Sequence, residues 1–276
     1  MDAKKERTSL AVRIFLVIAF LVPFAAGYFG NLFAKERFLE IRVLNVGQGD
    51  AILIKTPHNK KVLIDGGPKP GIVGKIPTDF PFFTCNVDVV LLTHSHEDHI
   101  TGINSVLKRC TSSLLIINDI GSLKEAPKAN LQITPGFSGD KFVVDDVNFY
   151  ILWPQKDFSS SDANNLSIVV LVEYKGYKAL FTGDAESDIL SKVEKEPVNL
   201  LKVPHHGSSD EHLQALLQQI RPEVMAISVG ENSFGHPSSQ VLGAADSANV
   251  RVFRTDKSGD IVIKVDSKGN AKVETP

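Results

Sequence analysis

The sequence predicts a mixed α/β domain in which two mixed sheets pack face to face with helices on the outside. Three short apolar runs, at residues 40–46, 51–56 and 61–65, are separated by polar and turn residues, as in a β-meander. Later apolar runs alternate instead with helical patterns, which is typical of strands joined by crossover helices. The chain has 276 residues, of which 43% are hydrophobic, enough for one large domain or two small ones.

A strand expected at residues 87–92 runs directly into the segment Thr93-His94-Ser95-His96-Glu97-Asp98-His99. Alternate residues of an extended chain share a side, so we expect the imidazoles of His94 and His96 to point the same way. Asp98 and His99 then fall where a helix begins. Two ligand pairs, His/His and Asp/His, are what two neighbouring divalent ions need in order to share one activated water.

Two further aspartates follow predicted strands. In Ile64-Asp65-Gly66-Gly67 an apolar strand leads to a carboxylate and two glycines, which permit a tight turn close to a ligand. Asp65 could be part of an ordinary turn, but we expect it to be a carboxylate that orients a metal-bound histidine. A strand at 177–181 leads to Asp184, at the start of a helix carrying Ile189, Leu190 and Val193; taken alone, Asp184 could be merely its N-cap.

A pair of adjacent histidines follows a buried strand expected at residues 198–203, in the loop Pro204-His205-His206-Gly207-Ser208. Adjacent side chains in an extended loop point to opposite sides, so we expect the two imidazoles not to bind the same ion. We favour His206 as the metal ligand and His205 as a neighbouring or substrate-contacting group. The sequence does not decide which of the two histidines binds the metal.

These motifs together resemble a known family. The spacing H-x-H-x-D-H is the hallmark of the metallo-β-lactamase superfamily, and the chain is similar within it to the ComEC-like competence-protein hydrolase (nuclease) domain over about residues 39 to 265. The resemblance implies a four-layer αββα sandwich that binds two divalent metal ions, Zn²⁺ or Mn²⁺. Besides the segment after residue 92, the motifs that carry it are 44–51, 62–67, 164–167, 180–184, 202–208 and 235–238.

The resemblance also implies a set of metal ligands. His94, His96 and Asn165 would hold the first ion, Asp98, His99 and His206 the second, and Asp184 would bridge the two. Most superfamily members supply a further histidine where this chain has Asn165, and no histidine lies between His99 and His205. An amide oxygen is a harder and weaker ligand than imidazole, which tilts the expected preference from Zn²⁺ toward Mn²⁺ or Mg²⁺.

A last histidine, His236, lies in Phe234-Gly235-His236-Pro237, between a strand at 224–229 and a following helix. Its side chain titrates near neutral pH, which suits a group that binds a scissile phosphate or protonates a leaving oxygen. A capped loop without a catalytic role is the alternative. We count His236 with Asp98 and His205 as the candidate catalytic residues.

The first 38 residues differ in kind from the rest. Residues 14–34 form an uncharged run of 21 behind a basic N-terminus, and about 20 apolar residues cross a bilayer. We expect a single-pass transmembrane helix with the domain outside the cell membrane. A secretory signal cleaved near Ala25-Ala26-Gly27 is the alternative. Residues 39–276 would form one hydrolase domain, because a division between Asp65 and His236 would split the site.

The two cysteines, Cys85 and Cys110, stand in no metal-binding or redox spacing, and we expect free thiols. Export would permit one disulfide between them, which is the alternative. Residues 39–276 carry 24 Lys/Arg and 29 Asp/Glu, a net charge of −5. Residues 39–276 therefore lack the overall positive charge that is typical of a non-specific DNA-binding protein. Two bound divalent ions would add about four positive charges at the mouth of the site, so phosphate would still be attracted locally.

The resemblance implies an exported binuclear metal-dependent hydrolase, a phosphodiesterase or DNA nuclease whose substrate is nucleic acid or another phosphodiester. The membrane, through the N-terminal helix, is the other partner, and no protein partner is predictable. Two alternatives stay open. The same fold supports hydrolysis of phosphocholine esters, lactones and β-lactams, and the chain could be a non-catalytic binding module stabilised by metal.

Overall fold

The computed structural model describes residues 19, 37–78, 84–124, 128–193 and 196–275, and those from Phe38 onward form one compact unit. Its first sheet begins with the expected meander and continues with parallel strands, because β3 to β6 run in the same direction. In sheet order the eight described strands are β15 (Ala271–Glu274), β14 (Ile261–Val265), β1 (Leu39–Val43), β2 (Ile52–Lys55), β3 (Lys61–Ile64), β4 (Val89–Leu91), β5 (Leu114–Ile116) and β6 (Gln132–Thr134).

The second sheet has seven described strands. Strands β10 to β13 are parallel, and β7 to β10 are antiparallel. In sheet order they are β13 (Arg251–Arg254), β12 (Val224–Ile227), β11 (Leu200–Lys202), β10 (Tyr177–Phe181), β9 (Val169–Tyr174), β8 (Val147–Trp153) and β7 (Lys141–Val144). The expected mixed α/β fold with two sheets is confirmed.

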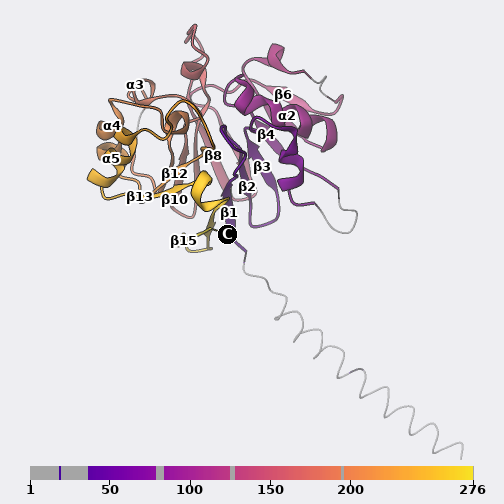
Figure 1. Cartoon of the computed structure of the whole chain (residues 1–276). Helices are drawn as coiled ribbons and strands as arrows, with labels where there is room; N and C mark the ends of the chain where they lie inside the picture. The colour runs from indigo at the N-terminus through magenta and orange to yellow at the C-terminus, as the bar shows by residue number, and fades with distance from the viewer. Residues whose placement is uncertain (1–18, 20–36, 79–83, 125–127, 194–195, 276) are drawn as a thin grey trace, which may run out of the picture. The chain divides into compact units, whose positions relative to one another are not determined.

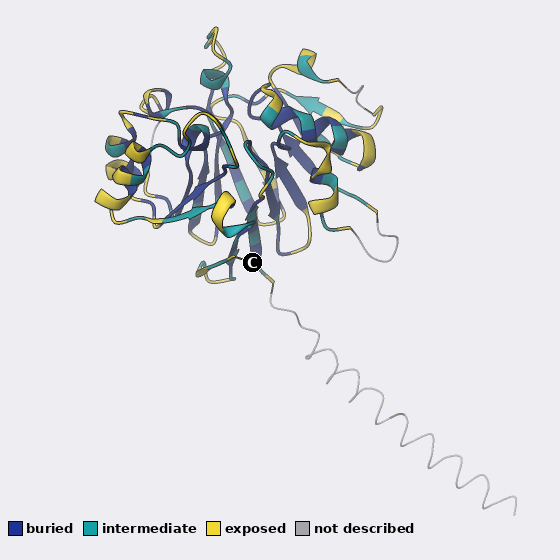
Figure 2. Ribbon diagram, in the orientation of Figure 1, coloured by how far each residue is buried: buried dark blue, intermediate teal, exposed yellow. Residues whose placement is uncertain are grey.

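Helices cover the outer face of each sheet, while the inner faces pack against each other (Figure 1). Alternate residues of β1 and β8 are buried between the sheets, where Ile41 and Phe149 belong to the central core. Figure 2 shows this burial as dark strands between partly exposed helices. The helical elements are η1 (Pro70–Lys75), α2 (Glu97–Arg109), η2 (Ile120–Ser122), η3 (Asn164–Leu166), α3 (Ser187–Leu190), η4 (Pro204–Gly207), α4 (Leu213–Ile220), α5 (Ser239–Ser247) and α6 (Thr255–Ser258).

Each outer layer has its own apolar cluster. Ile103 and Val106 of α2 pack with Leu63 and Val90 of the first sheet. On the second sheet, α4 and α5 bury residues such as Leu217 against β11 and β12. The amphipathic spacing of these helices therefore fixes which side of each sheet they occupy.

The predicted strands are confirmed, with differences at their ends. The strand at 177–181 coincides with β10, whereas those at 87–92, 198–203 and 224–229 are shorter, as β4, β11 and β12. At their carboxyl ends, the residues that these three strands lose begin the loops that follow them.

The helix predicted after Asp184 is wrong in its extent. α3 begins at Ser187 after the cap residue Glu186, and it ends at Leu190. Asp184 therefore lies outside the helix and is not its N-cap. Val193 still packs with Leu190 in the outer cluster, because the segment after α3 continues across the same apolar face.

The expectation of free thiols is also wrong, because Cys85 and Cys110 form a disulfide. Cys110 caps the C-terminus of α2, and the backbone N–H of Thr111 donates to the carbonyl of Cys85 at 3.0 Å. A parallel bridge between Asn86 and Thr111 continues this pairing. The two cysteines are 25 residues apart in sequence but 4.7 Å apart at Cα, a separation that allows a bridge.

The predicted N-terminal membrane or signal helix lies outside the described residues. Within the part of the chain that is described, no helix has the length and apolar character needed to cross a membrane.

Candidate metal centre

The polar groups of the site come from loops at the carboxyl ends of parallel strands. Asp65 follows β3, the histidine segment follows β4, Asp184 follows β10 and His206 follows β11. Parallel neighbours present the same end at the same edge of their sheet. The two packed sheets therefore bring both groups of loops together.

Four of the predicted ligands form one cluster. One ligand atom each from Asp98, His99, Asp184 and His206 lies within 4.8 Å of all the others. Nε2 of His99 is 3.3 Å from Oδ2 of Asp184, and Nε2 of His206 is 3.2 Å from Oδ2 of Asp98. Two imidazoles and two carboxylates at this separation suit a divalent cation.

His94 and His96 lie beside this cluster. Their ring centroids are 4.7 Å apart, as expected for residues on the same side of the turn; His94 is buried and His96 is exposed. Nε2 of His94 is 3.8 Å from Oδ2 of Asp184. The hydroxyl of Thr93 donates its one proton to Asp65. Oγ1 of Thr93 also lies 3.1 Å from Nδ1 of His94, and it can only accept there, so His94 carries its proton on Nδ1. This arrangement leaves the lone pair of His94 Nε2 available for an ion.

Several buried atoms of the cluster have no hydrogen-bond partner: Nε2 of His94, Nε2 of His99 and Oδ1 of Asp184. Burying such atoms unpaired costs free energy, and most buried polar groups in proteins are paired. The two Nε2 atoms lie 3.8 Å and 3.3 Å from Oδ2 of Asp184, and Oδ1 of Asp184 lies 3.9 Å from Nζ of Lys202. The residues present therefore fit a bound cation.

Asp65 lies behind the cluster. Its Oδ2 is 2.8 Å from Nδ1 of His99, and its Oδ1 accepts the backbone N–H of Thr93 at 2.8 Å. The two glycines after it permit this approach, because a Cβ on Gly66 would lie 2.3 Å from the backbone nitrogen of Ile103. Burial raises the pKa of Asp65, and the His99 imidazole partly offsets this rise.

Sequence reasoning missed the ion pair between Asp50 and Lys202, both completely buried. Nζ of Lys202 also donates to the carbonyl of Gly183 at 3.1 Å and lies 3.9 Å from Oδ1 of Asp184. Burial alone would raise the pKa of Asp50, but Lys202 and His206 outweigh it and hold this pKa well below its usual range. The signal in the sequence was a lysine inside an apolar strand.

His206 is the deeper of the two adjacent histidines. Its Nδ1 is 3.0 Å from the carbonyl of Ser228 and 3.3 Å from Oδ1 of Asp50, which turns Nε2 toward the cluster. The expectation of an extended loop is wrong, because both histidines adopt left-handed backbone angles, with φ of 46° at His205 and 54° at His206. The Nε2 atoms of both rings nevertheless approach Oδ2 of Asp184, at 3.6 Å from His206 and 3.9 Å from His205.

His205 is the more exposed of the two adjacent histidines, with 29% of its side chain accessible to solvent. Its Nδ1 is 2.9 Å from Oε1 of Glu186, which also accepts a hydrogen bond from Ser208 Oγ, and its Nε2 is 3.9 Å from Oδ2 of Asp184. The hydrogen bond from His205 lowers the pKa of Glu186. Glu186 thus orients His205 much as Asp65 orients His99.

His236 lies next to His205, with ring centroids 5.7 Å apart. Its Nδ1 is buried without a hydrogen-bond partner. Burial, and then the His205 imidazole, lower the pKa of His236. The predicted catalytic candidates Asp98, His205 and His236 are therefore brought to one region.

Asn165 is a predicted ligand for which no contact with the cluster is seen among the described residues. Within the described part of the chain, its side chain has no hydrogen bond or ion pair with the groups of the cluster. Its Nδ2 donates to Ser160 Oγ at 3.3 Å, and its backbone carbonyl accepts the indole N–H of Trp153 at 2.7 Å. Ser167, two residues on, does contact the site, because its Oγ is 3.3 Å from Nδ1 of His94 and accepts the N–H of Asp184.

The imidazoles of the cluster have pKa values shifted in different directions. Burial lowers the pKa of His206, but Asp184 and Asp50 outweigh it and raise this pKa to about 9. The pKa of His99 is likewise raised well above its usual value, against burial, by Asp184 and Asp65. Burial, and then His99, lower the pKa of His94 to about 3.

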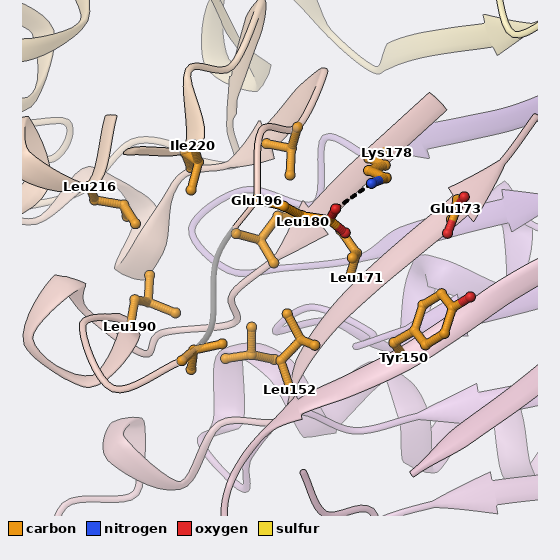
Figure 3. A pocket seen from close by; sticks show the side chains of 13 residues that line it. Tyr150, Leu152, Leu171, Glu173, Lys178, Leu180, Leu190, Glu196, Leu216 and Ile220 are labelled. Carbon is orange, nitrogen blue, oxygen red and sulfur yellow. Dashed lines mark hydrogen bonds and ion pairs between the residues drawn. The ribbon is translucent and has the colours of Figure 1, made fainter. Parts of the chain in front are cut away.

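A separate cavity of about 480 Å³ lies on the outer face of the second sheet, beside α3 and α4 (Figure 3). Leu152, Leu171 and Leu180 form part of its apolar wall, and Lys178 pairs with Glu196 at its rim. Among the described residues that line it, none belongs to the metal cluster. We therefore place the chemistry of the protein at the cluster.

Comparison with known proteins agrees with this geometry. The chain is 29% identical over 252 residues to ComE operon protein 3 of Bacillus subtilis (strain 168), covering 80% of this chain and 32% of that protein. It is 28% identical over 231 residues to Recombination protein 2 of Haemophilus influenzae (strain ATCC 51907 / DSM 11121 / KW20 / Rd), covering 80% of this chain and 28% of that protein. The chain thus spans less than a third of the length of these curated relatives.

Solved structures show the same fold. The metallo-beta-lactamase fold protein YhfI of Bacillus subtilis superposes with a TM-score of 0.57 at 12% identity, covering 82% of this chain and 99% of that protein. The family model for the metallo-beta-lactamase superfamily matches residues 44–231, a range that includes the histidine segment, Asp184 and His206. The chain belongs to the metallo-beta-lactamase superfamily.

Proposed function

We propose that this chain is a binuclear metal-dependent phosphodiesterase that acts as a nuclease. His94, His96 and Asn165 would hold one ion and Asp98, His99 and His206 the other, with Asp184 shared between them. Nδ2 of Asn165 is used by Ser160, which leaves its Oδ1 available as a ligand. Because imidazoles dominate with one amide, Zn²⁺ and Mn²⁺ are the ions to test.

The position of Asp184 carries the proposal. Its Oδ2 lies 3.3 Å from Nε2 of His99, 3.6 Å from that of His206 and 3.8 Å from that of His94. One carboxylate oxygen thus faces histidines from both proposed ligand sets. This is the place that a bridging carboxylate requires.

Two divalent ions in this cluster would lower the pKa of a shared water and stabilise charge on the phosphoryl oxygens. The protein's own groups supply the rest. Asp65 and Ser228 fix the tautomers of His99 and His206, so that each presents Nε2 to the site. His205 and His236, whose ring centroids are 5.7 Å apart, would hold the phosphate or give a proton to the leaving oxygen.

Two observations favour nucleic acid among phosphodiesters. One relative carries a name that refers to recombination, a process that acts on DNA. The other is that His205, beside the cluster, has 29% of its side chain exposed, so a phosphate within a longer chain could reach it. We also keep the proposal that residues 1–38 export the domain, which predicts that protease added to intact cells reaches a tethered domain, or that a released domain appears in the periplasm or medium.

The proposal is tested with residues 39–276, loaded with Mn²⁺ or Zn²⁺, on bis-p-nitrophenyl phosphate, single-stranded DNA and nitrocefin. We expect two ions per chain and hydrolysis of the first two substrates only. Asp98→Asn should abolish hydrolysis. Glu97→Gln is the matched control, because the neighbouring Glu97 side chain is 88% exposed. Hydrolysis of nitrocefin alone, or one ion per chain without activity, would contradict the proposal.

A further inference from the structure

Phe234 is an aromatic side chain held out in solvent. Its exposed fraction is 72%, and among the described residues the other large exposed hydrophobics are Ile120 and Val143, each at 54%. Phe234 lies on the loop between β12 and α5. Exposing a ring of this size forgoes the free energy of burial, so a role outside the core is indicated.

The loop holds the ring in this position through Asn232. Its Oδ1 accepts the backbone N–H groups of Phe234 at 3.1 Å and His236 at 3.0 Å. Its Nδ2 donates to the carbonyls of Gly230 and His236, both at 2.9 Å. Gly235 completes the turn with φ of +79°. The exposure of Phe234 is therefore built into the backbone.

The same loop is attached to the metal cluster. The Phe234 ring centroid is 5.7 Å from that of His236, with the planes tilted by 33°, and His236 in turn adjoins His205. The backbone N–H of Ser238 donates to the carbonyl of Gly207 at 2.8 Å. Phe234 is thus an exposed aromatic residue joined through His236 to His205 beside the metal cluster.

We propose that Phe234 stacks on a nucleobase next to the phosphate that is cleaved, so that the substrate is a single-stranded nucleic acid. The inference rests on the proposed function and names how its substrate is held. Residues 39–276 carry a net charge of −5 and therefore lack the general attraction for phosphates that a basic surface gives. Stacking on an aromatic side chain needs no positive charge and accepts every base.

Loss of one stacked base weakens binding by roughly 5- to 150-fold. The test compares a thymidine octanucleotide with an abasic phosphodiester chain of the same length, both with the Mn²⁺-loaded protein. Phe234→Ala should raise KM for the octanucleotide by about tenfold, within that range. The same variant should leave KM for the abasic chain unchanged, and Phe234→Tyr should restore the wild-type value. Val143→Ala, at a distant exposed site, is the matched control.

The outcomes separate this inference from the proposed function. A wild-type protein that cleaves both chains, with a Phe234→Ala variant whose KM is unchanged or rises equally for both, overturns the stacking role and leaves the nuclease intact. A wild-type protein that cleaves neither chain overturns the nuclease and, with it, a nucleobase as the ligand of Phe234. Unchanged Mn²⁺ stoichiometry in Phe234→Ala shows that the site is folded.

Discussion

Oδ2 of Asp65 lies 2.8 Å from Nδ1 of His99, and neither side chain has any exposed surface. The pair joins a turn after β3 to the first turn of α2. Since Nδ1 of His99 is used by the carboxylate, Nε2 is left to face Asp184. The orientation of one metal-ligand candidate is thus set by a residue that does not face the site.

The first prediction follows from this pair. Asp65→Asn should weaken Mn²⁺ binding by about 10- to 100-fold, the usual effect of losing such a supporting carboxylate. Isothermal titration of the metal-free protein measures it. Glu40→Gln, a partly buried carboxylate on β1, is the control. Wild-type affinity in Asp65→Asn would show that the His99 ring is held by its packing alone.

The second prediction separates the adjacent histidines. His206→Ala should reduce the bound metal from two ions to one and abolish hydrolysis, because His206 Nε2 lies within 3.6 Å of both Asp98 and Asp184. His205→Ala should keep both ions and lower kcat. Metal analysis of the purified variants decides between them. Loss of an ion in His205→Ala would reverse the two roles.

The third prediction concerns Asn165. Asn165→His should raise Zn²⁺ affinity and shift the preference away from Mn²⁺, because imidazole is a softer ligand than an amide oxygen. Competition between the two metals, followed by titration, measures the shift. Ser160→Ala, which removes the hydrogen bond to Nδ2, serves as a control for the loop. An unchanged preference would show that residue 165 is not a ligand.

The fourth prediction concerns the disulfide. Cys85 and Cys110 close a loop of 25 residues, and loops of this size contribute about 3 kcal/mol through the entropy of the unfolded chain. Reduction, or replacement of both cysteines by serine, should lower the free energy of unfolding by about this amount. Urea unfolding with and without reductant measures it. The doubly substituted variant should not respond to reductant, and equal stability of wild type and variant would contradict the prediction.

The sequence predicted the parts of this structure that depend on local pattern. Alternation and apolar runs located the strands, and the spacing of His94, His96, Asp98 and His99 located the cluster, because all four follow one strand. The disulfide was mispredicted because it depends on a backbone pairing between Cys85 and Thr111, which no local pattern reports.

The His-His loop was mispredicted in conformation for a related reason. Adjacent left-handed residues are costly for side chains with a Cβ, so an extended loop was the better expectation. Tertiary contacts of His206 with Ser228 and of His205 with Glu186 accompany the strained conformation. Partners this distant in sequence are not visible before the fold is known.

The last prediction concerns Lys202 and Asp50, the buried pair that the sequence did not reveal. Lys202→Met removes the only ammonium that the structure describes against Asp50 and leaves this buried carboxylate with the His206 imidazole, 3.3 Å away, as its remaining partner. Breaking a buried pair in this way costs about 3 to 5 kcal/mol. Lys202→Met/Asp50→Asn should recover much of this loss, since it removes the unpaired charge as well.

Both variants should also bind metal more weakly, because Lys202 lies 3.9 Å from Oδ1 of Asp184 and its hydrogen bond to the carbonyl of Gly183 holds the loop in place. Urea unfolding in the presence of a chelator measures the free energy of unfolding of the metal-free proteins, separately from any change in metal binding. If the double variant were no more stable than Lys202→Met, the role of Lys202 would lie in its contacts with the Asp184 loop rather than in its charge beside Asp50.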